Sequence, residues 1–126
     1  MSSVLDAAIN RMFPENFIKE SPKFVAIRKE RLANADPALF ANAALSLTSF
    51  DNRPDLKSIA NETLIVVGLA DETTPPALSH ELHNGIPNTQ LIELPGIGYC
   101  PQLQDPVAFL KAIKSFLGYS DQNNIS

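Results

Sequence analysis

The feature that most constrains this chain is a short apolar run at residues 63–67, Thr-Leu-Ile-Val-Val, which polar residues and Gly68 bound. An unbroken β-branched run of this length is typical of a strand buried on both faces of a parallel sheet. Residues 90–94, Gln-Leu-Ile-Glu-Leu, form a second and less apolar strand candidate. A buried parallel strand normally lies among other strands, yet no strand signal precedes residue 62. The sequence therefore predicts a two-stranded sheet whose apolar strand needs neighbours that these residues do not obviously supply.

Prolines mark the helix starts. At four places a residue that favours the N-cap position precedes a proline, which is tolerated at the first helical position because its missing N–H has no partner there. These pairs are Ser21-Pro22, Asp36-Pro37, Thr74-Pro75 and Asp105-Pro106. We predict one helix from Pro75 to about residue 84 and another from Asp105 to Leu117, where Gly118 ends it. The second half is then a strand-helix-strand-helix unit with a parallel strand pair.

The first half is predicted to be helical. A fifth helix start is Ser3, with Asp6 three residues later in the spacing of a capping box. Residues at helical spacing predict one stripe on each of three helices, namely Val4, Leu5, Ala8, Ile9, Met12 and Phe13; then Phe24, Val25, Arg28 and Leu32; then Leu39, Phe40, Ala43, Ala44 and Leu47. A short helical turn is expected at residues 53–59.

We expect one domain over residues 1–118. Its helical part covers residues 1–60, its β-α-β-α part covers residues 61–118, and a frayed polar tail follows at residues 119–126. A chain of 126 residues with 44% hydrophobic residues is long and apolar enough to form a core.

Charge and cysteine content exclude several classes of function. Ten basic residues against 14 acidic ones give a net charge of −4, which argues against nucleic-acid binding and against a polybasic membrane anchor. The single cysteine, Cys100, excludes an intrachain disulfide and favours a reducing compartment. The sequence has no evident signal peptide and no apolar run long enough to span a membrane. We therefore expect a cytoplasmic protein without nucleic-acid or membrane partners.

An ordered set of motifs runs from Leu56 to Leu117 and resembles the C-terminal part of an α/β-hydrolase, of the kind that includes enol-lactonases and related esterases. The set consists of Leu56 and Ile59, the strand TLIVVG, Asp71 with Thr74-Pro75, Ile86-Pro87, the strand LIEL, Gly98-Tyr99 with Pro101, and a last helix ending at Phe116-Leu117. The helical first half resembles the later part of that family's lid. The resemblance implies an α/β protein with a partial α/β-hydrolase fold.

The resemblance also implies a Ser–Asp–His catalytic system in that chain order. Asp71 matches the acid, which would orient the histidine and stabilise its charged form. Tyr99 stands where the family has the histidine, and a phenol with an ordinary pKa near 10 is a poor general base, although it can donate a hydrogen bond to Asp71. No Gly-x-Ser-x-Gly motif is present. Losing one member of such a system lowers the rate by several orders of magnitude, so we predict that the chain alone does not hydrolyse.

Structural roles compete with the catalytic ones. Asp71 is also typical of a turn residue before a helix, where the helix dipole favours a carboxylate. Tyr99 is also typical of an aromatic side chain that fills the space of a histidine.

Other candidate residues are interpreted as structural. His80 and His83 lie one residue short of the His-Glu-x-x-His spacing and face away from the apolar stripe, so we expect them in solvent and predict no metal. Cys100 has no basic neighbour in sequence and is interpreted as a small buried residue. Arg28 and residues 29–31 are interpreted as a solvated helix face. No cofactor is expected.

Three hypotheses of function remain. In the first, the chain is an incomplete hydrolase-like protein that is non-catalytic and forms a homodimer through its open sheet. In the second, it is half of a split ester or lactone hydrolase, and another polypeptide supplies the nucleophile and the base. In the third, it is a fragment without a function of its own.

Overall fold

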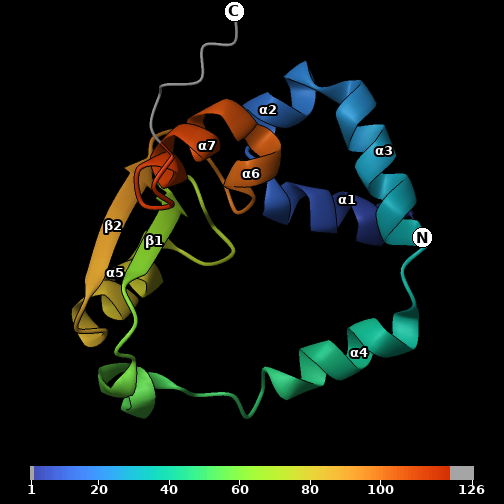
Figure 1. Cartoon of the computed structure of the whole chain (residues 1–126). Coiled ribbons are helices and arrows are strands. Elements are labelled where there is room, and N and C mark those ends of the chain that lie inside the picture. The colour runs from blue at the N-terminus through green and yellow to red at the C-terminus, as the bar shows by residue number, and fades with distance from the viewer. Residues whose placement is uncertain (1, 120–126) are drawn as a thin grey trace, which may run out of the picture.

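A computed structural model describes residues 2–119 (Figure 1). Four helices come first, and a 3₁₀ turn, two strands and three further helices follow. They are α1 (Ser2–Met12), α2 (Glu15–Glu20), α3 (Pro22–Ala33), α4 (Pro37–Ser46), η1 (Arg53–Ser58), β1 (Thr63–Gly68), α5 (Pro76–Gly85), β2 (Thr89–Leu94), α6 (Pro101–Gln104) and α7 (Pro106–Lys114). No helix in this part of the chain is long and apolar enough to cross a membrane.

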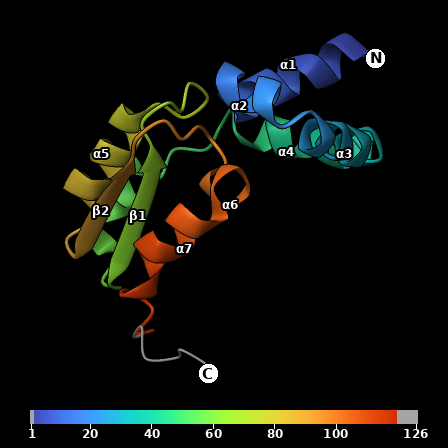
Figure 2. The ribbon, with the colours of Figure 1, turned by 90° about the horizontal axis from the view of Figure 1, so that it is seen from above.

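The two strands form the predicted parallel pair. The register runs from Thr63 opposite Thr89 to Gly68 opposite Leu94, with α5 as the crossover. Helix α5 contacts both strands, α7 contacts β1, and the two helices lie on opposite sides of the sheet (Figure 2). The β-α-β-α prediction is therefore confirmed.

The second edge of β1 has no strand neighbour among the described residues. The amides of Thr63 and Leu69 donate to carbonyls on the β2 side, at 2.9 and 3.0 Å. Because edges alternate along a strand, the amides of Leu64 and Val66 point to the free edge. An apolar groove of about 370 Å³ lies between β1 and the α7 region, lined by Leu64, Val66, Phe109, Ile113, Phe116 and Leu117.

Incomplete pairing explains the burial of β1. Val67 and Gly68 are buried, whereas residues 63–66 are only half-buried. The predicted burial on both faces therefore holds only at the carboxyl end of the strand, and α5 and α7 cover the rest only in part.

The main core lies between the lid-like helices and the loop after β2. Its buried members are Ile9 from α1, Phe13, Val25 from α3, and Cys100. Three aromatic rings, those of Phe13, Phe17 and Phe24, pack with centroids 5.2–5.6 Å apart. Helices α2 and α6 were not anticipated, because six and four residues are too few to display a helical period.

The predicted helix starts are confirmed at α3, α4 and α7. Asp36 accepts from the amide of Ala38 at 2.8 Å, and Asp105 accepts from that of Ala108 at 2.9 Å. The Thr74 prediction is wrong by one residue, since α5 begins at Pro76 after Pro75. Ser3 lies inside the first turn of α1, not before it.

The C-terminal helix is shorter than the sequence predicts. Helix α7 ends at Lys114, earlier than the predicted Leu117, and a turn then reaches Gly118 at φ 74°. Of the tail that we expected to be frayed, only Tyr119 is described, and it is exposed. The remaining tail residues, 120–126, lie outside the described part.

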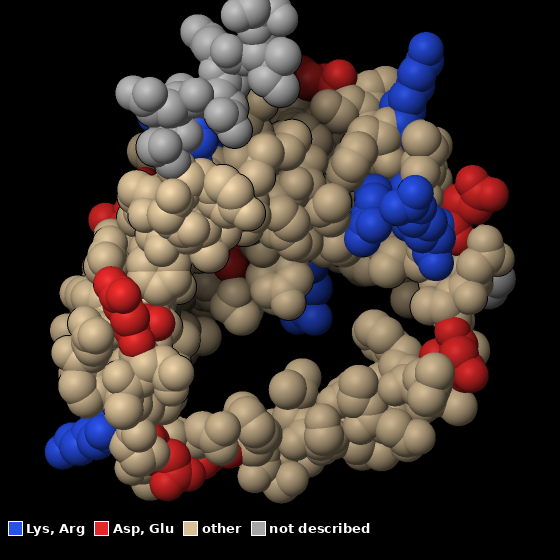
Figure 3. All heavy atoms as spheres, viewed as in Figure 1, with Lys and Arg blue, Asp and Glu red and all other residues tan. Residues whose placement is uncertain are grey.

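Helix α4 departs most from the sequence prediction. Every residue from 33 to 55 is exposed, so the expected stripe on this helix covers nothing. The helix spans from α3 to η1 across an open space (Figure 1), and the space remains open when all atoms are drawn (Figure 3). Helical spacing correctly predicted the helix but not its burial.

We expect Gly68→Ala to destabilise the fold strongly. A Cβ at residue 68 would lie 2.2 Å from the carbonyl oxygen of Ile97 and 2.4 Å from that of Gly98, so the backbone must shift. The free energy of unfolding, measured by urea denaturation, should fall by at least about 2 kcal/mol. Gly118→Ala is the control: its Cβ meets nothing within 4 Å, and only the left-handed backbone opposes it, at about 1 kcal/mol. Equal losses would contradict this packing.

Candidate active site

The loops that follow β1 and β2 meet at the carboxyl end of the sheet. The amide of Ala70 donates to the carbonyl of Ile97 at 2.9 Å, and Gly68 packs directly against the carbonyls of Ile97 and Gly98. Parallel strands of an α/β sheet place their ligand sites at this end. The structure therefore brings together the two loops that carry Asp71 and Tyr99, as their positions after neighbouring strands led us to expect.

Asp71 is buried and fully hydrogen-bonded within its own loop. Its side chain is 7% exposed. Oδ1 accepts from the amides of Thr73 and Thr74 at 2.8 Å each, and Oδ2 accepts from the Thr74 hydroxyl at 2.7 Å. The two threonines were not singled out from the sequence, although an aspartate followed by Thr-Thr is a signal for such a turn. They hold the carboxylate where it lies.

Tyr99 does not bond to Asp71. The Tyr99 residue is 44% exposed, and within residues 2–119 the carboxylate of Asp71 takes its hydrogen bonds from Thr73 and Thr74 alone. The tyrosine–aspartate hydrogen bond that we considered is thus not formed. The triad positions assigned to Asp71 and Tyr99 by resemblance remain predictions.

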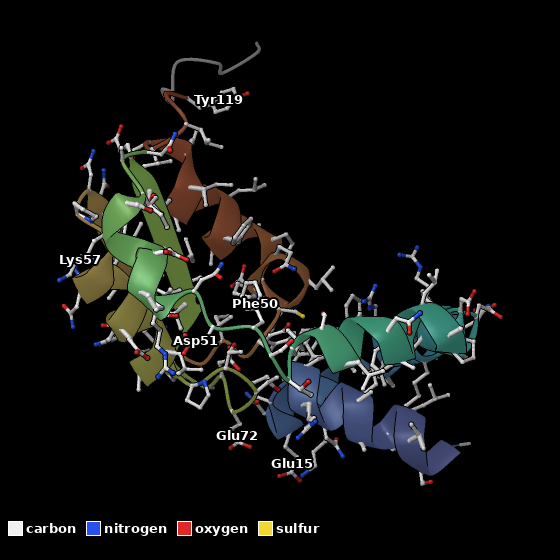
Figure 4. All side chains as sticks on the ribbon, turned by 90° about the horizontal axis from the view of Figure 1, so that it is seen from below. Glu15, Phe50, Asp51, Lys57, Glu72 and Tyr119 are labelled. Atoms are coloured by element: carbon white, nitrogen blue, oxygen red, sulfur yellow. The ribbon has the colours of Figure 1, made fainter. Side chains whose placement is uncertain are left out.

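The lid-like helices dock on both loops. The Thr73 hydroxyl donates to the carbonyl of Arg11 at 2.6 Å, and Gly98 lies against Pro14 and the carbonyl of Met12. A pocket of about 520 Å³ lies between the end of α1 and the loops, lined by Asn10, Arg11, Phe13, Pro14, Glu15, Ile18, Ala70, Glu72 and Gly98. Glu15 and Glu72 extend from its two sides (Figure 4). The lid-like helices therefore contact both loops at the candidate site.

Cys100 is buried, as predicted, at the start of α6. Burial raises the pKa of its thiol; nearby Arg28 acts in the opposite direction, and the charge of Asp71 adds to the increase. A thiol with a raised pKa is a weak nucleophile at neutral pH. Our interpretation of Arg28 as solvated is wrong in one respect, because α3 turns this position toward the core that holds Val25. The Nε atom of Arg28 is buried and has no hydrogen-bond partner among the described residues.

Both histidines bond elsewhere. His80 Nε2 lies 2.7 Å from Glu93 Oε1, and His83 Nδ1 lies 2.6 Å from Thr89 Oγ1, so both bridge α5 to β2. Neither bonds to Asp71. In the described part of the chain, no group of His, Cys, Asp and Glu side chains is arranged to hold a metal.

Comparisons with known proteins agree with this geometry. No protein-family model matches the chain. The chain is similar to 3-oxoadipate enol-lactonase 2 of Acinetobacter baylyi, with 26% identity over 117 residues, which are 93% of this chain and 43% of that protein. It superposes on the enol-lactonase of Burkholderia xenovorans with a TM-score of 0.88 and 24% identity, covering 94% of this chain and 45% of that chain. An α/β-hydrolase enzyme from a Medee basin deep-sea metagenome library gives a TM-score of 0.70 at 24% identity, with the same coverage.

The chain spans less than half the length of each of these proteins. The match nevertheless covers more than nine-tenths of this chain in each case. The resemblance inferred from the motifs is confirmed: the chain is similar in sequence to α/β-hydrolases and has a partial α/β-hydrolase fold.

Proposed function

We propose that these 126 residues form a hydrolase-like module that does not hydrolyse by itself. One observation carries the proposal: both oxygens of Asp71 are engaged by Thr73 and Thr74, and no histidine bonds to them. The two histidines of the chain are held at α5 and β2. A carboxylate that orients no base contributes nothing to nucleophile activation. The sequence also has no Gly-x-Ser-x-Gly motif to supply a nucleophile.

The module is proposed to self-associate through the free edge of β1. The amides of Leu64 and Val66 have no strand partner there, and an apolar groove runs beside them. An exposed strand edge is a template for pairing with another chain. Two copies related by a two-fold axis would pair their β1 strands antiparallel and form one sheet of four strands, which is a common sheet size.

A second candidate function is half of a split ester or lactone hydrolase. Two of the similar proteins are named enol-lactonases, which motivates the substrate class. The specific observation in favour is helix α4, which stands across an open space and exposes apolar side chains. In this alternative, another polypeptide fills that space and brings the nucleophile and the base.

We expect the purified chain to hydrolyse ester and lactone substrates no faster than buffer. A spectrophotometric assay with a nitrophenyl ester, and a pH-stat assay with a lactone, measure this. Asp71→Asn is the matched control, because the amide keeps the shape of the carboxylate without its charge. Turnover above the blank that Asp71→Asn abolishes would overturn the proposal.

The structural role of Asp71 predicts a loss of stability. Asp71→Ala removes the acceptor of three hydrogen bonds, and at about 1 kcal/mol each the free energy of unfolding should fall by about 2–3 kcal/mol. Asp71→Asn retains Oδ1 for the two amides and should lose less. Urea denaturation measures both variants. If Asp71→Ala were as stable as the unmodified chain, the turn would not depend on this carboxylate.

Self-association predicts a specific effect of Leu64→Pro. Proline removes only the amide that points to the free edge, and it is tolerated near the start of an edge strand. We expect sedimentation equilibrium to show that the unmodified chain assembles. The Leu64→Pro variant should lose the contact between β1 strands and therefore form an assembly of lower mass. Leu64→Ala, which keeps the amide, is the control. An unmodified chain that stays at 13.7 kDa in dilute solution contradicts self-association.

A further inference from the structure

Helix α4 and residues 47–50 after it form an apolar ridge without charge. The helix reads PALFANAALS and has no acidic or basic residue. Figure 3 shows the helix without blue or red atoms along its length. Each of the five largest apolar side chains on this ridge is 65–71% exposed, and they are Leu39, Phe40, Leu45, Leu47 and Phe50. An exposed apolar surface of this kind marks an interaction site.

A groove lies at the C-terminal end of the same ridge. It has a volume of about 780 Å³ and lies between residues 48–53 and α5. Its apolar members come from the segment, from η1 and from α5, and they are Phe50, Leu56, Leu78 and Leu82. Asp51 and Arg53 pair at its rim at 2.8 Å, and Figure 4 shows Phe50 and Asp51 in this segment. An apolar floor with a polar rim is the usual anatomy of a protein interface.

Ridge and groove belong to one continuous patch, and that favours a second copy of this chain as the occupant. A two-fold contact requires the same patch on both copies to offer both the projecting and the receiving surface. Here α4 is the projecting surface. The groove that would receive the partner's helix begins at Thr48, two residues after the end of α4. An antiparallel pair of α4 helices also brings opposite ends of the two helix dipoles together. Since α4 carries no charge, no like charges meet along the contact.

The available area is close to what a stable dimer needs. Leu45 lies about 160° around the helix from Leu47, and the other four side chains, each about two-thirds exposed, offer on the order of 500 Å² of apolar surface in each copy. Leu78 and Leu82, which are 49% and 41% exposed in the groove, add to it. A stable interface typically buries about 800 Å² on each partner.

We propose that two copies of this chain dock through α4, each placing its ridge in the groove of the other. This contact is distinct from the free edge of β1, and it adds to the proposed self-association a second two-fold axis. Two different two-fold contacts close into a tetramer with three perpendicular axes when the two axes meet at right angles. The proposal explains why α4 stands away from its own chain: the surface that it covers belongs to the other copy.

The test compares variants of both contacts by sedimentation equilibrium and native mass spectrometry. Phe40→Glu/Leu47→Glu places charges on the α4 ridge, at two residues that are 71% exposed and so do not hold the chain's own fold. Val4→Glu/Val107→Glu is the matched control, with the same change in net charge at two residues that are 70% and 76% exposed on α1 and α7. Far-ultraviolet circular dichroism verifies that each variant retains its helices.

We expect four chains for the unmodified protein and for the control, and two chains for Phe40→Glu/Leu47→Glu. Leu64→Pro alone should also give two chains, and the combination of all three substitutions one chain. If Phe40→Glu/Leu47→Glu keeps the mass of the unmodified protein, the α4 contact is wrong, whatever Leu64→Pro does. If only Leu64→Pro has no effect, the β1 contact fails and the α4 contact stands. A mass of Leu64→Pro that grows without limit with concentration would also overturn the two-fold α4 contact.

Discussion

Strand β1 pairs with one strand and has no second neighbour among the described residues, and this constraint leaves half-buried apolar side chains and unpaired backbone groups on one strand. Its sequence has the composition of a strand buried on both faces, but only Val67 and Gly68 reach that state. The groove beside Leu64 and Val66 is open for the same reason. Strand β1 carries both unpaired backbone groups and incompletely buried apolar side chains. Contact with another sheet would satisfy both of them.

The carboxyl end of the sheet is tightly packed, in contrast to the free edge of β1. Gly68 packs against the next loop so tightly that no side chain fits, and Gly98 packs against Pro14 of the lid-like part. Asp71 is held by threonines in its own loop. The surroundings of the candidate acid are thus maintained by packing and local hydrogen bonds, which need no histidine. Such an arrangement is stable whether or not the acid takes part in a reaction.

Sequence patterns predicted the elements whose cause is local. The parallel pair followed from a β-branched run on either side of a helix, and Asp36 and Asp105 cap their helices as their pairing with proline indicated. Thr74 failed as a cap because its hydroxyl and its amide serve the carboxylate of Asp71. There the need of the buried Asp71 carboxylate for hydrogen-bond donors outweighed the preference of threonine for the N-cap position.

The candidate site was predictable only in part. That the loops with Asp71 and Tyr99 meet follows from the spacing of parallel strands, about 5 Å. The direction in which each side chain points does not follow from that spacing, and Tyr99 turns toward solvent instead of bonding to Asp71. Helical spacing placed Arg28 on the same stripe as Val25, but spacing assigns a face and not the depth of the residue within the core.

Helix α4 shows what the helical spacing of apolar residues can and cannot predict. The spacing of Leu39, Phe40 and Leu47 indicates a face that prefers burial, but the surface that buries it need not come from the same chain. Burying a side chain of this size stabilises a protein by about 1.5–3 kcal/mol. Five of them left about two-thirds exposed therefore forgo on the order of 5–10 kcal/mol, a sum comparable with the whole stability of a small domain. A surface worth that much is better explained as half of an interface than as the outside of a monomer.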